Sequence, residues 1–172
     1  MKHMTLLYRL VMVIMVAGIL LGPTGLHAAP RTGQPAPDFK VSTTSGQQVT
    51  MENYRGRVLV LDFFASWCQP CRESIPHLVE MNRKYGQKGL YVLGMSADED
   101  GVRAVTSFAD KHRITYPIAL AGESTLTDYG VRSVPVMFVI DKKGQVAGVF
   151  RGFTDEVARS TEQLVKKLLA ER

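Results

Sequence analysis

The stretch VLVLDFFA at residues 58–65, followed two residues later by the only cysteines of the chain, constrains the fold more than any other feature. It is nearly all apolar and rich in β-branched and aromatic residues, which predicts a strand buried on both faces of a mixed or parallel sheet. The cysteines, Cys68 and Cys71, lie in WCQPC, and the residues after them have helical spacing. The sequence therefore predicts a buried strand that leads through the cysteine pair into a helix.

The remaining segments alternate between extended and helical patterns. Extended segments are expected as a hairpin at 38–51, buried strands at 90–97 and 134–140, a short piece at 114–120 and an antiparallel return at 145–150. Helices are expected at 73–86, 101–112, 123–130 and 154–172, the second capped by Asp98 or Asp100 and the last by Thr154. Strands separated by helices predict the α/β class, with a central mixed sheet flanked by helices on both faces.

The N-terminal segment has the layout of a secretory signal. Lys2 and Arg9 supply positive charge, an apolar run extends from Leu10 to Leu21, and GPTGLHAAP ends in small residues. The run is shorter than the roughly 20 residues that a membrane-spanning helix needs. This favours cleavage after Ala28, while an uncleaved signal anchor remains an open alternative.

We therefore divide the chain into a signal peptide or signal anchor at 1–28, a linker at 29–37 and a folded domain at 38–172. The leader predicts that the domain lies outside the cytoplasm, in the periplasm, either released or tethered by the anchor. The formal net charge of +5 is spread along the chain. No aromatic platform interleaves with the basic residues, which argues against nucleic-acid binding.

The cysteine pair has two structural interpretations, and neither is favoured. A disulfide that closes a ring of four residues stabilises by only about 2 kcal/mol, against about 4.7 kcal/mol for a hundred-residue loop. Zinc needs four ligands, and beyond the leader the only histidines are His77 and His112. Helical spacing turns His77 away from Cys71, so we expect a lone surface histidine and no metal site.

A reactive pair agrees best with the position of the cysteines. Cys68 lies at or near the start of the predicted helix, where free N–H groups and the helix dipole stabilise a thiolate. Cys71 is one turn later on the same side, so it is expected to resolve the mixed disulfide that Cys68 forms. Pro70 is compatible with a helix start. Trp67 places a large ring beside the pair, either for substrate contact or as an ordinary core residue.

The WCQPC motif and its surroundings resemble those of the thioredoxin superfamily. WCQPC follows VLVLDFFAS, the lead-in GQPAPDF lies at 33–39, CRESIP opens the helix, and SVP precedes the last strands. With the leader, the pattern resembles the extracytoplasmic TlpA/ResA-like branch over about residues 33–170. The resemblance implies a thioredoxin-like fold with an N-terminal β-hairpin and a strand–helix insertion at about 90–122. It also implies a redox-active disulfide that needs no cofactor.

The resemblance assigns roles to further residues. Pro135 matches the cis-proline that opposes the cysteine pair, and Val134 before it would offer its backbone to a substrate strand. Asp62 matches the buried aspartate beneath the second cysteine. Burial should raise the pKa of Asp62, so that it can take and return the Cys71 proton near neutral pH.

One position departs from the ResA-like pattern. Proteins of that branch often carry a glutamate three residues after the second cysteine, where this chain has Ser74. Glu73 is one residue earlier, about 100° away around the helix, and is expected to face solvent. The missing glutamate is expected to affect which partners the protein recognises, and to leave the exchange chemistry unchanged.

The sequence thus predicts an extracytoplasmic thiol-disulfide oxidoreductase that works as a monomer. We expect it to reduce protein disulfides through Cys68 and Cys71, for example in apocytochrome c during cytochrome c maturation, with electrons from a membrane thiol-disulfide donor. Three alternatives stay open: a protein-disulfide oxidant, a peroxiredoxin-like peroxidase that shares the APDF lead-in, and a copper or other metal carrier.

Overall fold

The apolar run after residue 57 forms the middle strand of the sheet. A computed structural model describes residues 29–171, and the expected signal segment at 1–28 lies outside them. The sheet has five strands in the order β5-β4-β3-β6-β7. Their bounds are β3 Val58–Phe64, β4 Leu90–Ser96, β5 Ile118–Leu120, β6 Val136–Ile140 and β7 Val146–Arg151. The first three strands are parallel, and β6 and β7 are antiparallel to their neighbours, so the predicted mixed sheet is confirmed.

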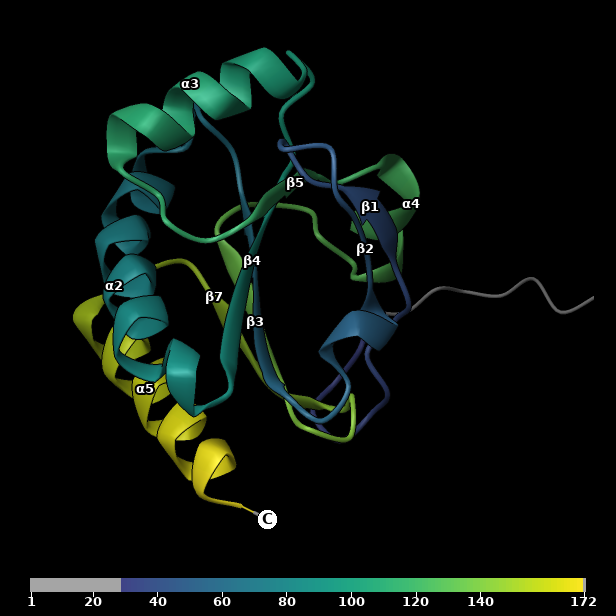
Figure 1. Cartoon of the computed structure of the whole chain (residues 1–172), viewed down its shortest axis with the longest axis vertical. Coiled ribbons are helices and arrows are strands. Elements are labelled where there is room, and N and C mark those ends of the chain that lie inside the picture. The colour runs from purple at the N-terminus through teal and green to yellow at the C-terminus, as the bar shows by residue number, and fades with distance from the viewer. Residues whose placement is uncertain (1–28, 172) are drawn as a thin grey trace, which may run out of the picture.

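The two faces of this sheet are covered by different layers (Figure 1). Val60 and Phe64 of β3 pack in one core with the three long helices, whereas Leu61 and Phe63 pack in a second core with the N-terminal hairpin. Alternation along the strand produces this division, because successive side chains point to opposite faces. The helices on the first face are α2 Gln69–Tyr85, α3 Val102–His112 and α5 Asp155–Ala170, and a short 3₁₀ turn η2, Gly86–Lys88, follows α2. The second face carries β1 Lys40–Ser42, β2 Gln48–Thr50, the 3₁₀ helix η1 Met51–Tyr54 and α4 Glu123–Asp128.

The segment just before the hairpin is held against the C-terminal part of the sheet. The Gly33 N–H donates to the Val146 carbonyl at 2.8 Å, and the Ala36 N–H donates to the Gly144 carbonyl at 2.9 Å. The Tyr129 hydroxyl donates to the Pro37 carbonyl at 2.7 Å. Residues 33–37 of the expected linker are therefore packed on the domain. Within residues 29–171, no helix combines the length and the hydropathy needed to cross a membrane.

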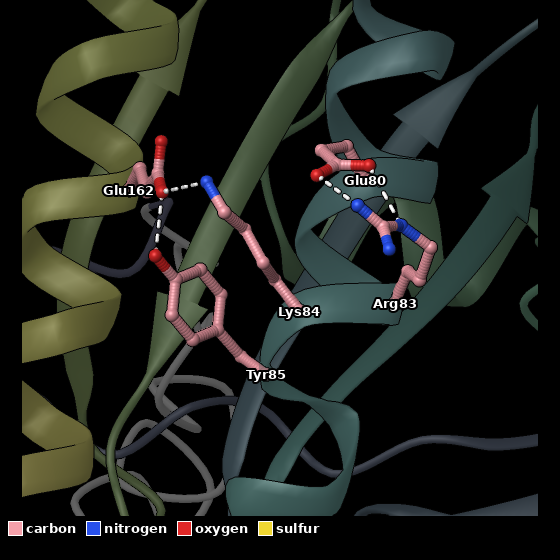
Figure 2. A network of polar contacts seen from close by, with 5 residues as sticks. All are labelled: Glu80, Arg83, Lys84, Tyr85 and Glu162. Carbon is pink, nitrogen blue, oxygen red and sulfur yellow. Dashed lines mark hydrogen bonds and ion pairs between the residues drawn. The ribbon is translucent and has the colours of Figure 1, made fainter.

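A polar network fastens the C-terminal part of α2 to α5 (Figure 2). The Tyr85 hydroxyl donates to Glu162 Oε1 at 2.5 Å, and Lys84 Nζ contacts the same oxygen at 3.2 Å. Arg83 and Glu80 form a separate ion pair within α2, at 2.7 Å. The hydrogen bond from Tyr85 lowers the pKa of Glu162, so its charge is retained at neutral pH. The network fixes the far end of the helix that carries the cysteines at its start.

Candidate active site

The two cysteines lie at the start of α2. Cys68 is the residue that caps the helix, and its Sγ accepts the Cys71 N–H at 3.2 Å. The sulfurs form a disulfide with an S–S distance of 2.04 Å. Cys68 keeps 4% of its surface exposed, whereas Cys71 is completely buried. Cys68 is therefore the sulfur that a partner can reach, and the free N–H groups and dipole of α2 stabilise its thiolate after reduction.

Asp62 is fully buried within β3. It lies on the same face of β3 as Val60 and Phe64, and α2 covers that face and brings Cys71 into the same core. Neither carboxyl oxygen of Asp62 has a hydrogen-bond partner. Burial raises the pKa of Asp62 to about 7, because a charged carboxylate loses its hydration there. The predicted burial and raised pKa are confirmed, and the carboxyl can exchange a proton near neutral pH.

Pro135 and Val134 lie where β6 begins. The peptide bond between them is cis, as the resemblance implies. Pro135 is buried, and its carbonyl accepts the Gly152 N–H at 2.9 Å. Val134 is half-buried and contacts both hydrophobic cores. The loop before β6 is thus held firmly.

Trp67 forms one wall of a groove beside the cysteines. Its side chain is 68% exposed, so the alternative role as an ordinary core residue is wrong. The groove has a volume of about 160 Å³ and is lined by Trp67, Ala97, Leu126, Val131, Arg132, Ser133 and Val134. Most of this lining is apolar, and Arg132 supplies the one charge. Sequence analysis missed Ala97 and Leu126, because Ala97 directly follows β4 and Leu126 lies within α4, far from the cysteines in the chain, and neither carries a local signal.

Asp98 holds the loop that leads into the cysteines. One carboxylate oxygen of Asp98 accepts the Ser66 N–H at 2.9 Å and the Ser96 hydroxyl at 2.6 Å. The other accepts the Ser66 hydroxyl at 2.5 Å. On the other side of the same loop, Arg72 donates to the Ser66 carbonyl at 3.0 Å. The expectation that Asp98 or Asp100 caps α3 is wrong, because Gly101 occupies the N-cap position and the Asp98 carboxylate is directed at Ser66.

Replacing Asp98 by alanine should loosen this loop. The buried Ser96 hydroxyl and the half-buried hydroxyl and N–H of Ser66 would lose their acceptor, so we expect the free energy of unfolding to fall by about 3 kcal/mol. Urea unfolding measures the loss, and hydrogen exchange of the Ser66 amide should become faster. The exposed neighbour Asp100 provides the control, since Asp100→Ala should change stability by less than about 0.5 kcal/mol. Equal effects of the two substitutions would contradict the assigned role of Asp98.

Three polar residues of α2 were the subject of expectations, and two of these expectations are confirmed. Glu73 is exposed, and Ser74 is fully buried, with its hydroxyl donating to the Cys71 carbonyl at 2.9 Å. No acid therefore occupies the position three residues after Cys71. His77 is not the surface residue that we expected, because α5 packs over that side of α2. Its ring lies 6.1 Å from the ring of Phe153, and burial lowers its pKa.

Comparisons with known proteins agree on one group of relatives. The family described as AhpC/TSA matches residues 32–149. Thiol-disulfide oxidoreductase ResA of Bacillus cereus is 28% identical over 98% of this chain and 99% of its own length. The ResA protein of Geobacillus thermodenitrificans is 31% identical over 84% of this chain and 88% of its own length. A Chlorobium tepidum crystal structure, provisionally named a DsbE thiol:disulfide interchange protein, has 31% identity and a TM-score of 0.77, and the match covers 83% of this chain and all of that one.

Proposed function

The chain belongs to the AhpC/TSA family and is a thioredoxin-like thiol-disulfide oxidoreductase, and from this premise we propose that it reduces protein disulfides outside the cytoplasm. The observation that carries the proposal is a disulfide between a slightly exposed Cys68 and a fully buried Cys71, together with a buried carboxyl on the strand that leads to them. The leader pattern at 1–28 supports the extracytoplasmic location.

Two features favour reduction over oxidation. The residues between the cysteines, Gln69 and Pro70, carry no charge that would stabilise a thiolate. The Asp62 carboxylate, buried on the same side of the sheet, disfavours a second negative charge nearby. A couple whose reduced thiolate form is only modestly stabilised gives up its electrons readily.

The exchange proceeds in two displacements. The Cys68 thiolate attacks one sulfur of a substrate disulfide, which forms a mixed disulfide and releases the first substrate thiolate. Asp62 then accepts the Cys71 proton, and the Cys71 thiolate attacks the Cys68 sulfur. This breaks the mixed disulfide and releases the second substrate thiolate, which takes up a proton. The substrate gains two electrons, the enzyme ends as the disulfide, and a membrane dithiol donor restores its thiols.

The groove beside Trp67 would hold the substrate segment around the attacked disulfide. Its apolar walls match an extended segment with an apolar side chain next to the cysteine, and the backbone of Val134, which lines the groove, would hydrogen-bond that segment. Apocytochrome c, the substrate that the resemblance to the ResA-like branch suggests, is our first candidate, acted on by a monomer of this chain.

The Cys71→Ser variant, expressed with its leader in the native host, tests this proposal. Because the mixed disulfide can no longer be resolved, we expect disulfide-linked adducts on Cys68 in the extracytoplasmic fraction.

We also expect the reduction potential of the wild type to lie near that of thioredoxin, about −270 mV, and far below that of DsbA, about −120 mV.

A variant with both cysteines replaced by serine is the control, and it should trap nothing. The absence of adducts, or adducts confined to the cytoplasm, would argue against an extracytoplasmic reductant. A potential close to that of DsbA would identify a protein oxidant in its place.

A further inference from the structure

A buried tyrosine lies beside the site and has no role in the steps above. Tyr116 follows α3 and precedes β5, and its side chain is 5% exposed. Among residues 29–171, only Asp62, Tyr116 and His77 have a fully buried side-chain polar atom without a hydrogen-bond partner. A buried polar group without a hydrogen-bond partner destabilises the folded state. Asp62 and Tyr116 lie on the same side of the sheet, so the two unpartnered groups call for a common explanation.

The sheet register places these two groups near one another. Asp62 lies directly opposite Gly94 on β4. The Tyr116 ring lies over Gly94, since a Cβ built there would be 3.4 Å from ring carbon Cε2, next to the carbon that bears the hydroxyl. A side chain on residue 94 would also crowd Phe64 and Ile118, at 3.1 and 3.2 Å. Glycine at this point is what allows the phenol to approach the strand position facing Asp62.

The electrostatics agree with this geometry. Burial raises the pKa of Tyr116, and the charge of Asp62 raises it further, so the phenol keeps its proton and can act only as a donor toward a carboxylate. Among the described residues, the other titratable side chains of this core are Cys68 and Cys71, whose sulfurs form the disulfide, and Tyr85, whose hydroxyl donates to Glu162. His77 of α2 and His112 of α3 also lie on this side, against Phe153 and Phe108. From β6 the residue opposite Asp62 is Met137, which carries no charge.

We propose that Tyr116 is the positioning residue for Asp62: its hydroxyl hydrogen-bonds the carboxylate across one water molecule and holds it for proton exchange with Cys71. This inference rests on the role of Asp62 in the proposed function. A donor to the carboxylate stabilises its charged form, which is the form that accepts the Cys71 proton. Tyr116 thereby sets the pH range in which the second displacement is fast.

Tyr116→Phe tests the inference by removing only the hydroxyl. We expect the pH profile of single-turnover insulin reduction to shift to higher pH, with a rate lowered about three- to tenfold at about pH 6 and unchanged at about pH 8.5. In an Asp62→Asn background the same substitution should have no further effect on the rate, because the two residues act together. Site-specific 3-fluorotyrosine at position 116, a stronger donor of nearly the same shape, should shift the profile to lower pH and provides the test if the phenylalanine variant folds poorly.

The matched control is Tyr129→Phe on the opposite face of the sheet. The Tyr129 hydroxyl has its own partner in the Pro37 carbonyl, so this variant should lose stability without shifting the profile. If Asp62→Asn removes the inflection near neutral pH but Tyr116→Phe and the fluorotyrosine leave the midpoint of that inflection in place, the inference is overturned and the proposed function stands. If Asp62→Asn leaves the profile unchanged, the proposed role of Asp62 fails, and the inference fails with it.

Discussion

Cys68→Ser should abolish thiol–disulfide exchange, whereas Cys71→Ser should still attack a substrate disulfide and then stop. Only Cys68 reaches the surface and receives the free N–H groups of α2, and a serine hydroxyl is not ionised at neutral pH. We expect the rate of insulin reduction to fall about a thousandfold or more in Cys68→Ser. With Cys71→Ser, mass spectrometry should find one substrate chain linked to each enzyme molecule.

The two single variants serve as controls for each other, because both remove the disulfide. Each should lose only about 2 kcal/mol of stability, as expected for so small a ring. If the two variants are equally stable but differ in exchange chemistry, the difference arises from the separate roles of the two sulfurs. Attack retained by Cys68→Ser and lost by Cys71→Ser would reverse the assignment.

Asp62→Asn should slow the second displacement and remove the pH dependence centred on about 7. General base catalysis by a positioned carboxylate contributes on the order of a hundredfold or more, and the amide cannot accept the Cys71 proton. Burial sets the relevant pKa to about 7. Stopped-flow measurement of mixed-disulfide decay from about pH 5 to about pH 9 would show a slow profile without an inflection near about pH 7 in the variant. Glu73→Gln, an exposed acid on the same helix, should leave the profile unchanged.

The same substitution should stabilise the oxidised protein at alkaline pH. Burial raises the pKa of Asp62 from its ordinary value of 3.8 to about 7, so the folded state binds a proton more tightly than the unfolded chain. The contribution of Asp62 to the free energy of unfolding is fully present below about pH 4 and is lost as the pH rises through about 7. At about pH 8 the ionised carboxylate therefore costs up to about 4 kcal/mol, which Asp62→Asn should recover in urea unfolding. A wild type that is equally stable at about pH 5 and about pH 8 would rule out this cost.

Local patterns in the sequence predict the features that depend on neighbouring residues. The continuous apolar run of β3 predicts a strand buried on both faces, and the spacing after it places Cys68 at the start of α2. Asp62 is predicted to be buried because apolar residues flank it on both sides. The cis bond before Pro135 follows from the resemblance, since the sequence around it contains no physical signal for the isomer.

The sequence by itself thus determined the fold class, the reactive pair and the buried acid, because strand alternation, helix spacing and burial are properties of short segments. Only the tertiary structure brought Asp98 to Ser66, Leu126 to the groove beside Trp67, and Tyr116 to the strand position facing Asp62. These residues come from segments far from the cysteines in the chain, and parallel pairing of β3, β4 and β5 brings them to the site. The sheet register selects which of these side chains meet, and no short segment of sequence encodes that register.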